Sequence, residues 1–262
     1  MGGGGGVGTL AQYGKPLARL ARSGALAALD FFLPRACVCC DLALRAEDDA
    51  LVCALCLARI SRLPAPQCDR CGHPTRGQTC GWCALLPPFV RCARSVCWVP
   101  TGVGGDLVHK LKYDGWTRLA EPMGDRMARL SFPRDVIEER AMMVAVPLAH
   151  SRLRERGYNQ SELLATRIGE RWGVPIGAAL VRRRATESQT RLTPGGRLRN
   201  VASAFEIAVS RRELAGRHVI LVDDVVTTAA TLNACAAELH AGGARIITYI
   251  TFGRARAAGD AP

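Results

Sequence analysis

The sequence predicts an α/β protein in which a parallel sheet is preceded by a small cysteine-rich module. From about residue 94, short apolar segments alternate with amphipathic ones, which is typical of a parallel sheet covered by helices on both faces. Upstream of them, eight cysteines form four C-x-x-C pairs. The apolar segment His218–Val222 runs into two aspartates, and ligands of such sheets bind beyond the carboxyl ends of the strands.

The domain boundaries follow from shifts in composition along the 262 residues. We expect a glycine-rich and then amphipathic leader at 1–36, a double zinc module at 37–90, the α/β domain at 91–255 and a tail at 256–262. The chain has no run of 18 apolar residues, so we expect no membrane-spanning helix. We therefore expect a cytoplasmic protein.

The elements of the α/β domain are predicted from their length and apolar spacing. Short, continuous apolar runs indicate buried strands at Ser95–Pro100, Ala141–Leu148, Ala178–Arg182, His218–Val222 and Ala244–Phe252. Longer segments with apolar residues three or four apart indicate helices at Gly105–Tyr113, Leu119–Leu130, Ser161–Trp172 and Thr231–Ala241.

The cysteine pairs predict two structural zinc sites. A C-x-x-C turn directs two thiolates at one point, and four thiolates suit tetrahedral Zn²⁺. The eight candidate ligands are Cys37, Cys40, Cys53, Cys56, Cys68, Cys71, Cys80 and Cys83. Pairing consecutive motifs is simplest, although the spacing also allows a crossed arrangement. The alternative is a disulfide-rich module, which suits a secreted chain. A module this small needs the metal for much of its folding free energy.

The charge of the chain is locally concentrated. The formal net charge is +12, and residues 150–200 contain 11 arginines against four glutamates. A basic surface attracts polyanions, such as nucleic acid or a phosphate-rich small molecule. The alternative is that most of these arginines only keep the surface soluble.

The segment after His218–Val222 predicts a site for a phosphorylated sugar. A loop that leads into a helix presents backbone N–H groups to an anion. Thr227, Thr228 and Thr231 add hydroxyl donors, and Ala229 and Ala230 let an anion approach the backbone. Asp223 and Asp224 suit vicinal hydroxyls or a hydrated Mg²⁺. Together these features fit a ribose 5-phosphate. The alternative is a pair of turn aspartates before an ordinary helix start.

This segment, VILVDDVVTTAATL, resembles the phosphoribosyl pyrophosphate (PRPP) motif of type I phosphoribosyltransferases, whose usual form ends in T-T-G-A-T. Ala229 stands at the glycine position. If that position requires a positive φ, alanine costs about 1 kcal/mol there.

Further segments resemble the competence protein F (ComF) family. They are VPLAHSRLRERGYNQSELLA, RRRATESQTRLTPGGRLRNVASAF, HKLKYDG and the upstream C-x-x-C pairs, and the resemblance covers residues from about 30 to 255. It implies a phosphoribosyltransferase-like fold with an N-terminal zinc ribbon and an association with DNA uptake during natural transformation.

The resemblance also implies roles for individual residues. Asp223 and Asp224, the candidate catalytic residues, would hold the ribose hydroxyls, and Thr227, Thr228, Ala229, Ala230 and Thr231 would hold the 5-phosphate. Pro147, His150, Arg152, Arg154 and Arg197 would serve the pyrophosphate, Arg197 from a lid at 182–200, with Mg²⁺ bound alongside PRPP. A surface loop at 147–150 and a linker at 182–200 are the alternatives.

Two functions of different classes fit these observations. One is catalytic transfer of phosphoribose to an unknown acceptor. The other is a single-stranded-DNA-binding adaptor within the competence machinery, with PRPP as a regulator or a vestige. The net charge favours the adaptor, whereas 14 aromatic residues in the whole chain provide few platforms for stacking bases. Neither the acceptor nor the oligomeric state is predicted.

Overall fold

The computed structural model describes residues 35–44, 50–75, 80–183 and 204–256. It divides into two compact units, residues 1–56 and 57–262. Within the first, an antiparallel bridge joins Ala36 and Ala43. The short helix α2 (Ala54–Ala58) begins in the first unit and ends in the second. Within the described part of the chain, no helix has the length and apolar character to cross a membrane.

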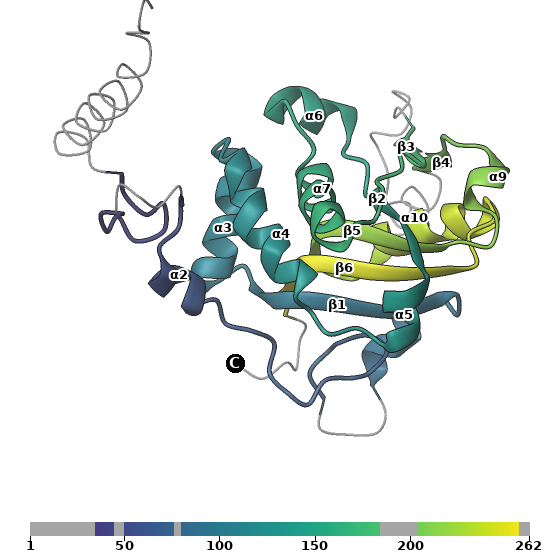
Figure 1. Cartoon of the computed structure of the whole chain (residues 1–262), viewed down its shortest axis with the longest axis horizontal. Coiled ribbons are helices and arrows are strands. Elements are labelled where there is room, and N and C mark those ends of the chain that lie inside the picture. Colours follow the sequence, from purple (N-terminus) through teal and green to yellow (C-terminus); the bar gives the residue numbers. More distant parts are fainter. Residues whose placement is uncertain (1–34, 45–49, 76–79, 184–203, 257–262) are drawn as a thin grey trace, which may run out of the picture. The chain divides into compact units, whose positions relative to one another are not determined.

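A four-stranded parallel sheet forms the centre of the second unit (Figure 1). Its order is β1 (Val90–Val99), β6 (Ile246–Ala255), β5 (His218–Val226) and β2 (Arg140–Ala145), and every pairing is parallel. The central strands are buried over most of their length, as their continuous apolar runs predict. A separate antiparallel pair consists of β3 (Leu180–Arg182) and β4 (Phe205–Ile207).

Helices pack on both faces of the sheet. The helices α3 (Gly102–Tyr113), α4 (Ala120–Ala128) and α7 (Gln160–Trp172) lie together on one side of it (Figure 1). On the other face, α10 (Ala230–Ala241) packs on β5 and β6, and its Leu232 and Leu239 share a core with Val219 and Leu221.

Shorter helices connect these elements. They are η1 (Gly81–Leu85), η2 (Thr117–Leu119), α5 (Arg134–Glu139), α6 (His150–Arg156) and α9 (Arg211–Leu214). The fold is therefore the α/β architecture with a parallel sheet that the alternating pattern predicts.

Two strand boundaries differ most from the sequence prediction. The first strand begins at Val90 rather than Ser95, because its arginine-containing first half also pairs with β6. β5 continues past Val222, and its pairing with β6 extends to Val226. The prediction ended β5 too early because two adjacent carboxylates interrupt its apolar run. Asp223 and Asp224 consequently belong to a hydrogen-bonded strand rather than to a loop.

Candidate functional site

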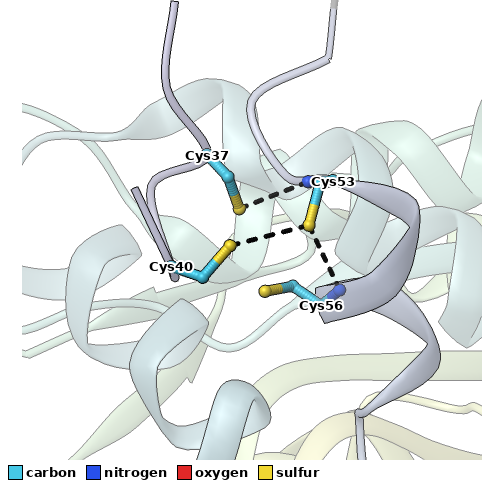
Figure 2. A group of neighbouring side chains, drawn as sticks. All are labelled: Cys37, Cys40, Cys53 and Cys56. Carbon is cyan, nitrogen blue, oxygen red and sulfur yellow. Dashed lines mark hydrogen bonds between the residues drawn. The ribbon is translucent and has the colours of Figure 1, made fainter. Parts of the chain in front are cut away.

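The first cysteine group lies in unit 1 and has the arrangement of a metal site. Cys37, Cys40, Cys53 and Cys56 come together with their Sγ atoms all within 4.8 Å of one another (Figure 2). The backbone N–H of Cys53 donates to Cys37 Sγ at 3.3 Å, and that of Cys56 donates to Cys53 Sγ at 3.3 Å. Such N–H donors favour thiolates, the form that binds Zn²⁺. The group fits a tetrahedral zinc ion.

The second cysteine group, in unit 2, repeats this arrangement. Cys68, Cys71, Cys80 and Cys83 also lie within 4.8 Å of one another, with Sγ–Sγ distances of 3.3 Å for Cys68–Cys83 and 3.4 Å for Cys71–Cys80. Burial opposes ionisation of Cys68, but hydrogen bonds from the Cys71 backbone and the Cys83 thiol lower its pKa to about 7. Both groups thus pair consecutive motifs rather than crossed ones, and both fit structural zinc.

A network of hydrogen bonds ties the second group to the sheet. Arg254 of β6, only 2% exposed, donates from Nη2 to Cys71 O at 2.6 Å and lies over the Trp82 ring at 5.2 Å. Asn233 of α10 donates to Leu85 O at 2.6 Å and accepts from the Tyr249 hydroxyl at 3.0 Å. Cys71 is therefore part of the same core as the sheet and α10.

The two aspartates lie near the carboxyl end of β5 and contact different helices. Asp223 Oδ1 accepts from Ser161 Oγ at 2.8 Å and from the Asp224 backbone N–H at 2.9 Å. Burial, followed by the neighbouring Asp224 charge, raises the pKa of Asp223 to about 7. A carboxyl group with that pKa changes charge within the physiological range.

Asp224 is almost fully buried and has capacity for a further contact. Its Oδ1 lies 3.1 Å from Lys112 Nζ, which extends from α3, while its Oδ2 has no hydrogen-bond partner among the described residues. An unpartnered buried carboxylate oxygen costs free energy until it is satisfied. This oxygen therefore fits a sugar hydroxyl or a hydrated Mg²⁺ at the end of β5.

The loop after β5 has the backbone conformation of an anion site. Thr227 and Thr228 are exposed, and α10 begins at Ala230 with no side chain capping its first turn. Ala229 adopts the left-handed conformation, with φ 60° and ψ 6°. The glycine at this position of the related motif predicts a positive φ here, and alanine is strained in that conformation. The loop already has this shape in the protein, so the strain acts against folding rather than against ligand binding.

We expect Ala229→Gly to change the free energy of unfolding by less than about 1 kcal/mol. Relief of the left-handed strain at position 229 should stabilise the folded protein by about 1–2 kcal/mol. Loss of a buried methyl group costs about 0.8 kcal/mol, and the freer unfolded chain costs about 0.4–1 kcal/mol. The methyl group packs in the core, because Ala229 is 5% exposed. Chemical denaturation measures the change, with Ala229→Val as the strained comparison, expected to destabilise. If the free energy of unfolding of the glycine variant were higher by more than about 2 kcal/mol, the three effects would not offset one another as expected.

The residues predicted to serve the pyrophosphate lie partly outside the described residues. Pro147 follows β2, and His150 begins α6 with Nε2 3.2 Å from Arg182 O. Arg152 pairs with Glu155 on the exposed face of α6 at 2.8 Å, and Arg154 is exposed. Arg197, like most of the predicted lid, falls outside the described residues.

The Arg156–Gln160 segment positions neighbouring elements. Asn159 caps α7 by accepting from the Ser161 N–H at 3.0 Å, and its Nδ2 donates to Val146 O at 3.0 Å. The Tyr158 hydroxyl donates to Leu111 O in α3. The Asn159 side chain is thus engaged in the cap of α7. This cap also holds Ser161 beside Asp223.

Two contacts at the site were not assigned from the sequence. Ser161 was predicted only as the first residue of a helix, and Lys112 only as part of the helix Gly105–Tyr113. Ser161 could have been singled out from the sequence, because Ser161 directly follows Asn159 and Gln160 in the segment that resembles the ComF family. No sequence signal pairs Lys112 with Asp224, which lies 112 positions further along the chain.

A cavity of about 410 Å³ adjoins the loop. It is lined by Val99, Pro100, Lys112, Tyr113 and Thr227, among others. Its walls come from the carboxyl ends of β1, β5 and β6 and from α3, so it opens where ligands of parallel sheets bind.

Two family models match different parts of the chain. Residues 28–96 match the double zinc ribbon domain, and residues 154–261 match the phosphoribosyl transferase domain. The match to the second model agrees with the parallel sheet and makes the fold that of a type I phosphoribosyltransferase domain.

Named relatives of the chain are associated with competence and DNA utilization. The DNA utilization protein YhgH of Escherichia coli is 30% identical over 213 residues, covering 75% of this chain and 87% of that protein. Competence protein F of Haemophilus influenzae is 41% identical over 92 residues, 35% of this chain and 40% of that protein. A Bacillus subtilis glutamine PRPP amidotransferase structure is 17% identical with a TM-score of 0.39, covering 60% of this chain and 30% of that chain. The chain belongs to the competence protein F family, with a double zinc ribbon and a type I phosphoribosyltransferase domain.

Proposed function

We propose that this protein binds PRPP with Mg²⁺ and transfers the phosphoribosyl group to an acceptor, in a process connected with DNA uptake or use. The proposal rests on one arrangement: a partly buried carboxylate, Asp223, and a buried one, Asp224, on β5, followed by a left-handed turn at an uncapped helix start. The names of the relatives, competence protein F and DNA utilization protein, support the connection with DNA.

Acceptor and donor groups of the site would hold different parts of PRPP. Asp223 and Asp224 would accept hydrogen bonds from the two ribose hydroxyls and fix the sugar. The first-turn N–H groups of α10 and the hydroxyls of Thr227, Thr228 and Thr231 would hold the 5-phosphate. Lys112, beside Asp224, balances charge in the site. Mg²⁺, when bound, would supply positive charge to the pyrophosphate oxygens.

Transfer itself would require little covalent chemistry from the protein. As the bond between C1 and pyrophosphate breaks, positive charge develops at C1, and a nucleophile on the acceptor forms the new bond there. Holding the ribose and the phosphate in place aligns C1 with the acceptor. The cavity lined by Tyr113, Pro100 and Val99 adjoins the phosphate loop and is our candidate acceptor site.

We expect PRPP affinity to rise with pH and to level off above about pH 7. The raised pKa of Asp223 keeps this carboxyl group protonated below about 7, and a protonated group must lose its proton to accept two hydrogen bonds. Below that pKa, each pH unit should change the affinity by up to about tenfold. Calorimetric titrations between pH 5.5 and 8.5 measure this dependence.

Ser161→Ala is the control for the pH experiment. Its hydroxyl donates to Asp223 and lowers the pKa of that carboxyl group, so its removal should move the midpoint to higher pH. The protonation of PRPP itself is the same with both proteins and cannot produce such a shift. Affinity that is independent of pH, or a midpoint unmoved in the variant, would count against the assigned role of Asp223.

An adaptor that binds single-stranded DNA is the second candidate. The net charge of +12 favours it, and DNA binding would then weaken steeply with salt. PRPP turnover distinguishes the first function from the second. Because eight of the twelve cysteines form two groups that fit zinc rather than disulfides, we also propose a reducing compartment, the cytoplasm, as the location.

A further inference from the structure

A second cavity, of about 370 Å³, has a strongly basic lining and shares no residue with the candidate PRPP site. Four arginines line it: Arg62, Arg94, Arg126 and Arg129. The lining carries one carboxylate, Asp69, and the zinc-ligand candidate Cys68. The four arginines and Asp69 together have a formal charge of about +3. No aromatic side chain contributes to the lining.

The fold brings these arginines together from distant positions. An antiparallel bridge joins Arg62 to Cys97, and the Leu63 N–H donates to Val96 O at 3.4 Å, which holds this segment against the edge of β1. Arg126 and Arg129, three positions apart, lie at the end of α4 and therefore on one side of the helix.

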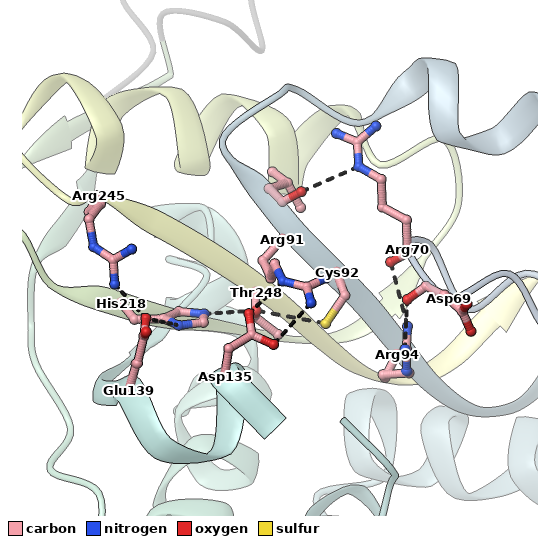
Figure 3. Close-up of polar contacts among 11 residues, drawn as sticks. Asp69, Arg70, Arg91, Cys92, Arg94, Asp135, Glu139, His218, Arg245 and Thr248 are labelled. Atoms are coloured by element: carbon pink, nitrogen blue, oxygen red, sulfur yellow. Dashed lines mark hydrogen bonds and ion pairs between the residues drawn. The ribbon is translucent and has the colours of Figure 1, made fainter. Parts of the chain in front are cut away.

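Arg94 forms a fixed wall of the cavity. Its guanidinium donates to Asp69 O at 2.8 Å (Figure 3), and also to Ser131 O at 3.0 Å and Ala93 O at 2.8 Å. These acceptors are neutral backbone carbonyls, so the positive charge of Arg94 is not cancelled. The same bonds join the cysteine turn to β1 and to the segment after α4, so they hold the cavity in shape.

The other three arginines have no acidic partner. Among the described residues, no carboxylate lies within ion-pair distance of Arg62, Arg126 or Arg129. Burial, followed by the charges of Arg62 and Arg129, lowers the pKa of Arg126. Like charges therefore face one another across a partly buried space, and a bound anion would relieve their repulsion.

We propose that this cavity binds a small molecule bearing two or more phosphate charges. Guanidinium groups match phosphate oxygens in pairs, and three of them remain available here. The volume suits a compact ligand, and the lack of aromatic side chains leaves no platform for the stacked bases of single-stranded nucleic acid. Stabilisation of the α4 carboxyl end would account for Arg126 and Arg129, but not for the convergence of Arg62 and Arg94.

Inorganic pyrophosphate is the probe for this site. The zinc-loaded full chain would be titrated calorimetrically without Mg²⁺, and the same titration repeated with the double variant Arg62→Gln, Arg126→Gln. We expect pyrophosphate binding at this site to weaken at least about tenfold in that variant, because two charged hydrogen-bonding groups are lost. The variant Arg212→Gln, Arg217→Gln makes the same charge change away from the cavity and should bind as the unmodified protein does.

Two comparisons separate this site from others. Asp223→Asn with Asp224→Asn should leave this pyrophosphate binding unchanged, whether or not the proposed PRPP site is correct. Zinc content and circular dichroism check that the arginine variant is folded. Equal pyrophosphate binding by the arginine variant and its control, or no binding by any of the proteins, would overturn the proposal. Loss of oligonucleotide binding alone, with pyrophosphate binding unchanged, would also overturn it, in favour of nucleic acid.

Discussion

Asp223→Asn combined with Asp224→Asn is expected to abolish PRPP binding and to leave the fold intact. A hydrogen bond to a charged group contributes about 1.5–3 kcal/mol, so the loss of two ionised acceptors should weaken binding at least about a hundredfold. Asparagine has nearly the same volume as aspartate. The substitution also removes the cost of placing two adjacent carboxylates at a largely buried position. Calorimetric titration with PRPP and Mg²⁺ measures the loss.

Asp135→Asn is the matched carboxylate control. Asp135 lies at the start of α5, where it pairs with Arg91, and it contacts none of the proposed PRPP residues (Figure 3). This variant should bind PRPP normally even if it is somewhat less stable. Unchanged PRPP affinity in the Asp223, Asp224 double variant would refute the site, provided that the unmodified protein binds PRPP.

Removal of zinc is the second change with a large expected effect, and the effect should differ between the two cysteine groups. Metal analysis of the protein purified under reducing conditions should find about two zinc ions per chain. Cys37→Ser and Cys71→Ser should each lose one. Only Cys71→Ser should destabilise unit 2, by at least about 3 kcal/mol, because Cys71 shares a core with Ala229 and Leu232.

Tryptophan fluorescence can separate the two outcomes. All four tryptophans, Trp82, Trp98, Trp116 and Trp172, lie in unit 2, so thermal unfolding followed by fluorescence reports on that unit. The Cys37→Ser transition should match that of the unmodified protein, and the Cys71→Ser transition should occur at lower temperature. A protein free of zinc would contradict both zinc sites. Equal transitions in the two variants would contradict the coupling of the second group to the sheet.

Much of this organisation could be predicted from local sequence patterns. The apolar run at His218–Val222 identifies a central strand, and the C-x-x-C spacing identifies both cysteine groups. The left-handed turn at Ala229 could be anticipated from the glycine in the related motif. These features depend on residues that are close in the chain, where periodicity and turn geometry determine the outcome.

The features that the sequence did not predict depend on contacts between distant residues. Arg254 is an arginine near the end of the chain, a residue type that is rarely buried, yet it lies beneath the second cysteine group. The contact between Lys112 and Asp224 joins two elements that only the folded sheet brings together. The arginine-lined cavity likewise draws on four segments. Contacts between such distant residues leave no periodic pattern in the sequence.

The anchoring of the second cysteine group by Arg254 and Asn233 affects how gene truncations should be interpreted. A shortened gene that starts near residue 90 would remove Cys71, Trp82 and Leu85. It would take away acceptors of Arg254 and Asn233 and expose the core that Cys71 shares with Ala229 and Leu232. A transformation defect in such a strain would then follow from a misfolded transferase domain, even if the ribbon never contacts DNA. Point substitutions on the outer surface of the ribbon are the genetic test that keeps these two causes apart.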